Sequence, residues 1–312
     1  MDVGSQVTVL YNAPYQMPFQ LPIAQYFYFT GLSAGSFVVS VIAVLGGKTE
    51  YKPLGRIGAI LAPLCLILAP MNLLVDMTQP LRFWHLMTYL PGYVNFRSPI
   101  TYGVMLLTSY PISAIVYAYF VYSDNLKWSK IMAIIGIPLA IAVHGYTGFI
   151  LALGKGRALW NTALMPTLFI VSAMVSGIAL MIIMAVIRNL WMMRDETPEA
   201  RQKDAQLICG LGNFLGAAIV ADLFLLFNAV LVILTSSQEA FHAAELLLWG
   251  HFAPEFIGVE LIIGALIPLV IVFYPKTKRS FAWLSLASVM TMVGIFAMRF
   301  TVVVGGQSVP LH

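Results

Sequence analysis

Long apolar stretches separated by short polar connections dominate the pattern of this chain. Eight stretches are long enough to cross a lipid bilayer, since a transmembrane helix needs about 20 mostly apolar residues. Their predicted limits are 21–46, 57–78, 100–122, 131–153, 164–187, 207–234, 256–274 and 281–303. The longest polar connection, around 188–206, leaves no room for a soluble domain. The pattern therefore predicts an all-α, polytopic membrane protein with eight transmembrane helices.

We expect these helices to pack as two four-helix bundles, residues 21–153 and 164–303. An N-terminal arm (residues 1–20) and a C-terminal tail (residues 304–312) flank the two bundles. The arm contains Asp2 and no Lys or Arg. It therefore lacks the positively charged region with which a cleavable signal peptide begins.

Composition supports this class and excludes others. The 312 residues are 60% hydrophobic and 10% charged, whereas about 25% of a soluble domain is charged. An ordinary cytoplasmic enzyme, a disordered tail and a disulfide-stapled secreted module are thereby excluded. The two cysteines, Cys65 and Cys209, lie in apolar runs and are expected to be small buried residues. They are too few for an iron–sulfur cluster, which usually needs four thiolates.

The 17 Lys and Arg residues predict how the chain lies in its membrane. We call the side that holds the N-terminus side A and the opposite side B. The side B connections carry 12 of these residues and side A carries five. The positive-inside rule then makes side B cytoplasmic and side A exoplasmic, with both termini exoplasmic. We expect a multi-pass protein of a bacterial or archaeal cytoplasmic (inner) membrane, without the basic groove that nucleic acid would need.

The side A connections are poor in charge and rich in aromatic, Pro and polar residues. They cover residues 76–99, 154–161 and 238–255. One interpretation is an aromatic belt at the membrane interface. The other is a docking face for a second subunit. The residues that would dock or support that subunit are Arg82, His85, Arg157, Trp160, Asn161 and Arg299.

Polar residues inside the predicted spans gather in the half of the membrane next to side A. An ionisable side chain at this depth is costly and usually faces a partner or a water-filled cavity. The half next to side B looks nearly bare. The residues concerned are Gln25, Tyr26, Tyr28, Asp76, His144, Tyr146, Asp222, Asn228, Glu260 and Arg299.

Three function classes compete for this pattern. A haem-b electron-transfer subunit needs about four intramembrane His ligands for two haems, and His144 alone lies clearly inside a span. A secondary transporter favours inverted repeats and a binding site at the midplane, and no convincing repeat is visible. A quinone-reactive subunit needs a Tyr or His donor for each carbonyl oxygen and a carboxylate that carries protons.

The third class matches the polar residues best. Tyr146, His144, Gln25 and Asp76 could supply the donors and the carboxylate at one depth. Positions 144 and 146 are about 200° apart on a helix, so only one of them points at a given ligand. We favour Tyr146, because the Tyr-Thr-Gly-Phe run that it begins contains small residues that allow close approach. A tyrosine bonded to a neighbouring helix is the structural alternative.

Several short motifs resemble those of the polysulfide reductase membrane-subunit family, also called NrfD-like. The resemblance covers most of the chain, and the order of the motifs relative to the spans makes it specific. The motifs are Gly31-Leu-Ser-Ala-Gly35, Asp76 with Pro80-Leu-Arg-Phe83, Ser98-Pro-Ile-Thr-Tyr-Gly103, Gly145-Tyr-Thr-Gly148, Arg157-Ala-Leu-Trp-Asn161 and Arg299-Phe-Thr-Val-Val-Val-Gly-Gly-Gln307.

The resemblance implies a membrane anchor that binds menaquinone or ubiquinone near the exoplasmic surface and holds no haem, metal or iron–sulfur cluster itself. It also implies an exoplasmic partner subunit with four iron–sulfur clusters. Through that subunit the anchor would serve a molybdopterin or multihaem catalytic subunit, which determines the terminal substrate. The family's quinone-binding Tyr falls on Tyr146. The second quinone contact, an Asn and His pair in the family, falls roughly on Gln25 to Tyr28, where the residue types differ.

The expected mechanism follows from these assignments. Tyr146, Gln25, Tyr28 and His144 would bind quinone. Asp76 matches the family's acidic position at the end of the second span and would transfer protons. Asp222 and Glu260 are further candidates for proton transfer, because lipid would penalise carboxylates at that depth. We therefore keep proton translocation as a hypothesis from the sequence.

Overall fold

A computed structural model describes residues 19–47, 51–77, 79–85, 95–193 and 197–308, and every regular element within them is helical. Eight helices are long and apolar enough to cross a membrane. This confirms the predicted all-α fold with eight candidate spans. The helices are α1 (Leu21–Leu45), α2 (Lys52–Asp76), α4 (Pro99–Tyr122), α5 (Leu126–Ala152), α6 (Met165–Trp191), α7 (Pro198–Thr235), η3 (Pro254–Leu266) continued by α9 (Ile267–Phe273), and α10 (Phe281–Phe300) continued by η4 (Thr301–Gly305) and α11 (Gly306–Ser308).

Several helices extend beyond the predicted apolar limits. Helix α7 begins at Pro198, where the Thr197 hydroxyl accepts a hydrogen bond from the Ala200 N–H and caps the helix. The last span continues to Ser308, well into the predicted tail. Hydropathy marks only the part of a helix that is apolar, so polar first or last turns are missed. The predicted N-terminal arm lies almost entirely outside the described residues.

Two short helices in the side A connections were not predicted. One is η2 (Pro80–Arg82), a single 3₁₀ turn. The other is α8 (Gln238–Leu248), which buries Ala240, Ala243, Ala244 and Leu247 and leaves its other side polar. An 11-residue amphipathic helix is too short and too polar to be found by a search for membrane spans.

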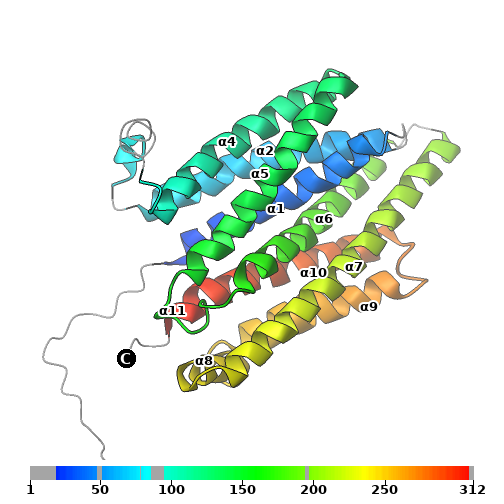
Figure 1. Ribbon diagram of the computed structural model, residues 1–312. Helices are drawn as coiled ribbons and strands as arrows, with labels where there is room; N and C mark the ends of the chain where they lie inside the picture. The colour runs from blue at the N-terminus through cyan, green and yellow to red at the C-terminus, as the bar shows by residue number, and fades with distance from the viewer. Residues whose placement is uncertain (1–18, 48–50, 78, 86–94, 194–196, 309–312) are drawn as a thin grey trace, which may run out of the picture.

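Figure 1 shows the long helices side by side, with α1 and α6 in the middle of the arrangement. Helices α2, α4 and α5 lie on one side of this pair, and α7, α9 and α10 on the other. Glycines allow the central pair to approach closely, because a Cβ atom on Gly177 of α6 would overlap the Gly35 Cα of α1. The division into two four-helix bundles stays a prediction.

Hydrogen bonds on side A join the two ends of the described chain. The Phe19 N–H donates to Gln307 Oε1 over 2.9 Å, and Gln307 Nε2 donates to the Phe19 carbonyl over 2.6 Å. The Arg157 guanidinium donates to the Gln307 carbonyl, and the Trp160 indole donates to the Val302 carbonyl. The start of α1 is therefore fixed against the end of the last span.

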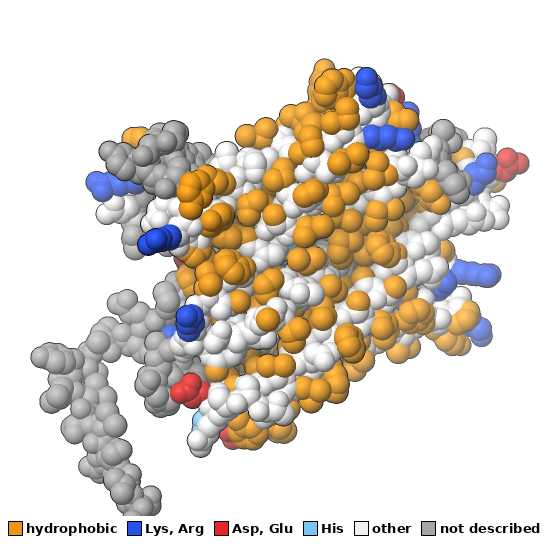
Figure 2. Space-filling model, in the orientation of Figure 1, with side chains coloured by type: hydrophobic (Ala, Val, Ile, Leu, Met, Phe, Trp, Pro, Cys, Tyr) orange, Lys and Arg blue, Asp and Glu red, His pale blue; other side chains and the backbone are white. Residues whose placement is uncertain are grey.

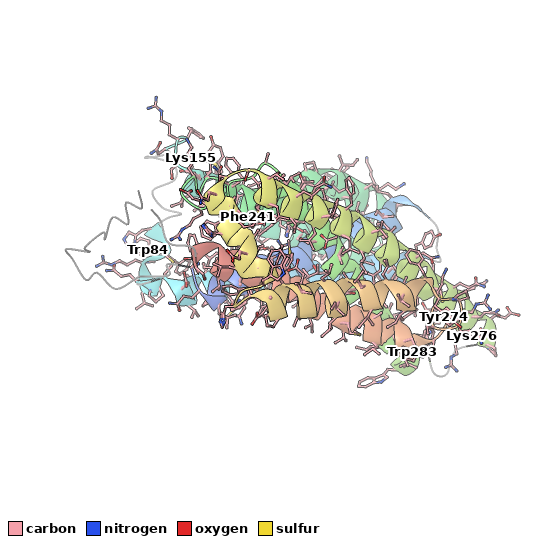
Figure 3. The ribbon with its side chains drawn as sticks, turned by 90° about the horizontal axis from the view of Figure 1, so that it is seen from below. Trp84, Lys155, Phe241, Tyr274, Lys276 and Trp283 are labelled. Carbon is pink, nitrogen blue, oxygen red and sulfur yellow. The ribbon has the colours of Figure 1, made fainter. Side chains whose placement is uncertain are left out.

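The surface fits a protein surrounded by lipid. Figure 2 shows hydrophobic side chains over the middle of the face in view, with Lys and Arg towards its two ends. In Figure 3, Trp84 and Phe241 lie at one end of the helices and Tyr274 and Trp283 at the other. Aromatic residues at both ends are typical of the two membrane interfaces. The chain is thus a multi-pass membrane protein, and the cytoplasmic assignment of side B rests on the sequence.

Candidate functional site

Two tyrosines from different helices lie within electrostatic range of each other near side A. Tyr146 of α5 packs directly over Gly103 of α4, where a Cβ atom would overlap the Tyr146 hydroxyl. Tyr26 of α1 is buried, and its phenol interacts electrostatically with that of Tyr146. The Tyr26 hydroxyl has no hydrogen-bond partner among the described residues. A buried phenol of this kind is free to donate to a ligand that enters beside Tyr146.

The residues near Tyr26 in the sequence point in other directions. The Tyr28 ring packs edge-on against Phe296 of α10, with ring centroids 5.4 Å apart, and so faces the second half of the molecule. Gln25 is partly exposed. The resemblance places the second quinone contact roughly on Gln25 to Tyr28, and within that range Tyr26 is the residue whose phenol interacts with Tyr146. The contact itself stays a prediction. Successive helical residues are about 100° apart, so the choice depends on a helix rotation that hydropathy leaves open.

Asp76 is the last residue of α2 and is partly exposed at the side A end of the first four helices. In the part of the chain that the structure describes, no ion pair involves it. The neighbouring Arg82 is exposed on η2, and the Arg157 guanidinium is directed at Gln307. Asp76 therefore lies at the side A end of α2 with its carboxyl partly open to solvent.

His144 is buried on a different face of α5 from Tyr146. A Cβ atom on Gly31 of α1 would lie 3.5 Å from His144 Nε2 and 3.6 Å from the Ser176 hydroxyl of α6. His144 thus sits where α1, α5 and α6 meet. Neither ring nitrogen has a hydrogen-bond partner among the residues described. His144 therefore belongs with a second group of polar residues, described next, rather than with Tyr146.

That second group is centred on Arg299, which is fully buried near the end of α10. Its Nη2 donates to the Phe169 carbonyl over 3.1 Å and to the Ser172 hydroxyl over 2.7 Å. The guanidinium carbon lies 3.8 Å from the centre of the Phe169 ring, a cation–π contact. Asp222 and Glu260 both interact electrostatically with this charge. We call Asp222, Glu260 and Arg299 the charge cluster.

The burial of two residues bears on the predicted docking set. Arg299 is predicted to dock or support a partner, and its complete burial favours support over direct contact. Trp160 is also buried and bonded to Val302, so it too has a supporting place. The exposed residues of the expected docking set are Arg82 and Asn161, and His85 is half-buried with its ring stacked on Trp84.

Two stretches of π-helix flank the charge cluster. Glu260 lies inside η3, and η4 begins two residues after Arg299. The π-helix is rare and frequently occurs at functional sites. An apolar cavity of about 40 Å³ adjoins Glu260 between α6, α7, α8 and the last span. Its lining is otherwise almost entirely apolar, so the cavity leaves the Glu260 carboxyl facing an apolar space.

The comparison with known protein families shows which family the chain belongs to. The model of the family described as polysulphide reductase, NrfD, matches residues 9–310, nearly the whole chain. The chain belongs to this family. Within the residues that the structure describes, no group of three or more His, Cys, Asp or Glu is arranged to hold a metal ion.

Individual relatives of this NrfD-family protein are parts of redox complexes by name. It is 30% identical to the Hdr-like menaquinol oxidoreductase integral membrane subunit of Archaeoglobus fulgidus, over 91% of this chain and 69% of the relative. It is 28% identical to one of the chains of polysulfide reductase from Wolinella succinogenes, over 92% and 93%. It is 24% identical to one of the subunits of selenate reductase from Mesobacillus selenatarsenatis, over 92% and 74%.

Proposed function

We propose that this NrfD-family protein is the quinone-reactive membrane subunit of a respiratory oxidoreductase complex. The observation that carries the proposal is the placement of Tyr26 within electrostatic range of Tyr146 at membrane depth, with the buried Tyr26 hydroxyl unpartnered among the described residues. The names of the relatives support it, since they include a menaquinol oxidoreductase subunit and parts of two reductases. The quinone is menaquinone or ubiquinone.

A quinone needs a hydrogen-bond donor at its carbonyl oxygen and an apolar place for its ring. Tyr146 is the donor, held in position by Gly103, and Tyr26 is the second donor beside it. The quinone ring enters from lipid between the side A ends of α1, α2, α4 and α5. Reduction of a quinone to a quinol takes two electrons and two protons, and oxidation of the quinol returns them. Asp76, at the side A end of α2, relays protons at the quinone.

The electrons pass between the quinone and a subunit docked on side A. We infer an exoplasmic partner with four iron–sulfur clusters, and beyond it a molybdopterin or multihaem catalytic subunit. The exposed or half-exposed Arg82, Trp84, His85 and Asn161 form a polar and aromatic surface on which such a partner can dock. This surface and the tyrosine pair both lie near side A, which suits electron transfer without a cofactor in this chain.

Replacement of single hydroxyls tests the tyrosine pair. Tyr146→Phe and Tyr26→Phe keep the ring and remove the donor, and we expect each to lower quinone-linked turnover of the intact complex by at least about tenfold. Tyr119→Phe is the matched control, because Tyr119 is 66% exposed on the outside of α4. Undiminished turnover in both test variants would contradict the proposal. A Soret band in the absorbance spectrum of the purified chain would instead favour a haem-b subunit.

We further propose that the charge cluster transfers protons. Two carboxylates lie within electrostatic range of one guanidinium, so a proton can reside on one of them while the group stays close to neutral. His144 interacts with the same guanidinium and extends the group towards α1. If this transfer crosses the membrane, turnover contributes to the proton gradient.

A proteoliposome experiment tests this second role. Asp222→Asn is compared with Glu239→Gln, which removes an exposed carboxylate of α8. We expect Asp222→Asn to reduce proton movement per electron while leaving Tyr146-dependent quinone binding in place. Equal proton movement in the two variants would exclude a role for Asp222.

A further inference from the structure

A second line of polar contacts runs through the first four helices towards side B. The sequence shows few ionisable residues in that part of the membrane. Polar or small residues recur every seven positions on both α1 and α4. Seven residues are close to two helical turns, so each set lies along one face of its helix. The set on α1 is Tyr26, Ser33 and Ser40, and the set on α4 is Gly103, Tyr110 and Tyr117.

The two sets meet pairwise in the interior. The hydroxyls of Ser33 and Tyr110 lie 3.4 Å apart, and those of Ser40 and Tyr117 lie 2.9 Å apart. The Ser40 hydroxyl donates to the Gly55 carbonyl of α2, so the Tyr117 hydroxyl is the donor to Ser40. All four side chains have no exposed surface. Together with the Tyr26–Tyr146 pair over Gly103 they form what we call the hydroxyl ladder.

Further hydroxyls lie between these pairs without a partner. Ser36 of α1 and Ser113 of α4 are buried, and their hydroxyls make no hydrogen bond to any described residue. Tyr26 shares this property at the side A end. An unsatisfied polar group in hydrocarbon costs several kcal/mol, and buried polar groups are commonly satisfied by ordered water. The interior of this half therefore favours bound water along the ladder.

A hollow lies beyond the side B end of the ladder. It has a volume of about 250 Å³ and is lined by residues of α1, α4, α5 and the start of α2. Its wall includes Val44, one turn beyond Ser40, and Val121, one turn beyond Tyr117. Asp124 lies at its rim with half of its side chain exposed, 2.8 Å from Lys52 and 3.0 Å from Arg56. These charges keep the mouth hydrated within one helical turn of the last hydroxyl pair.

We propose that the hydroxyl ladder carries protons between side B and the tyrosine pair. This inference rests on the proposed function, because the tyrosine pair is where the quinone reacts. The quinone then exchanges two electrons with the partner on side A and two protons with side B. Each hydroxyl accepts one proton as it passes on another, so no group on the ladder changes its net charge. The direction reverses when quinol is oxidised.

The competing explanation is that the hydroxyl pairs only hold α1, α2 and α4 together. In that case their loss lowers stability and leaves the rate of quinone chemistry unchanged. Tyr110→Phe and Tyr117→Phe separate the two, since each removes one oxygen and keeps the ring. Tyr119→Phe is again the control, because it removes the same atom from the lipid-facing side of the same helix.

The experiment uses the intact complex in proteoliposomes with a pH-sensitive dye inside. For Tyr117→Phe and Tyr110→Phe we expect quinone-linked turnover at saturating quinone to fall at least about tenfold, with KM for quinone unchanged. We also expect a larger solvent deuterium isotope effect, and the proton change on side B to slow with turnover. Tyr119→Phe should match the unaltered complex in all three readouts.

Several outcomes would overturn the ladder. One is turnover of Tyr110→Phe and Tyr117→Phe equal to that of Tyr119→Phe. Another is exchange of the protons on side A. The third is failure of both variants to assemble, which would make the hydroxyls structural. Failure of the proposed function is a different result. It would appear as turnover that does not depend on Tyr146 or Tyr26, whatever the ladder variants do.

Discussion

The two halves of this protein place polar groups in the membrane in different ways. In α1, α2, α4 and α5 the polar groups are neutral hydroxyls, paired at intervals along the whole length. In α6, α7, η3 and α10 they include full charges, one group around Arg299 and one ion pair, Arg188 with Asp204, nearer side B. A neutral hydroxyl needs a single partner, so it can stand anywhere along a helix. A charge needs several, so charges in lipid collect into groups.

The halves meet at α1 and α6. Gly35 and Gly177 bring the two backbones together, and His144 lies just towards side A of this contact, against Gly31 and Ser176. Its imidazole also interacts with the charge of Arg299. The histidine thus belongs to the first half by sequence and to the charge cluster by position, and it offers a physical link between the two kinds of polar arrangement.

The largest effect should come from breaking the charge cluster. Arg299→Leu removes the cation nearest to Asp222 and Glu260, and loss of one member from a buried charged group costs up to about 3–5 kcal/mol. We expect a strongly lowered melting temperature of the purified chain. The triple change Arg299→Leu, Asp222→Asn and Glu260→Gln should recover much of it. If Arg299→Leu melts like the unaltered chain, the cluster is not held by charge.

The joint between the halves should show the next largest effect. Gly177→Ala forces a methyl group into the Gly35 backbone, which cannot move aside as a side chain would. Overpacking of this kind costs about 1–3 kcal/mol. Gly210→Ala is the control, because nothing lies within 4 Å of a Cβ atom at that position and alanine favours the helix. Thermal melting of both variants measures the difference.

A smaller stability effect with a larger functional one is expected from Gly103→Ala. The new methyl group would displace the Tyr146 phenol, and this side chain has room to rotate towards lipid because Tyr146 is only partly buried. We expect a raised KM for quinone in the intact complex and a small change in melting temperature. Gly145→Ala is the control, since its Cβ atom would lie 3.6 Å from Ile170, an ordinary contact. An unchanged KM would argue against the position assigned to Tyr146.

The smallest effect should appear at the side B mouth of the ladder. The Lys52 ammonium and Arg56 guanidinium hold the pKa of the Asp124 carboxyl below its ordinary value. Because the folded-state pKa is the lower one, this stabilisation is present above about pH 4 and is lost as the pH falls through the folded-state value. Asp124→Asn should therefore melt slightly below the unaltered chain at neutral pH and equal it in strong acid. A difference that persists in acid would contradict this origin.

Much of the fold could be predicted from the sequence because lipid makes a simple demand. A helix such as α6 needs a long apolar run, and this run is visible in any window of about 20 residues. Helix α8 could not be found in this way, because it is short and polar on one side. The π-helical turns around Glu260 and Arg299 also have no signal in hydropathy, since they change the hydrogen bonding and not the composition.

The site was harder to predict, for a related reason. A helix that is apolar on all sides does not reveal which of its faces points inward, so Tyr26 and Tyr28 could not be distinguished. The buried pairs Ser33–Tyr110 and Ser40–Tyr117 are hard to predict because a lone hydroxyl in an apolar run resembles a chance substitution. The matching seven-residue intervals on α1 and α4 were the signal that could have found them.

Phe37 lies between two pairs of the ladder, Ser33–Tyr110 and Ser40–Tyr117. Its ring packs against both Tyr110 and Tyr117, with centroids 5.8 Å and 4.9 Å away, and fills the space above Gly136. An unbroken file of water through a bilayer would leak protons and dissipate the gradient that respiration builds. If the hydroxyl ladder carries protons, the Phe37 ring interrupts such a file of water and leaves the hydroxyls beside it as the route, so a single aromatic ring would limit proton leak through this half of the protein.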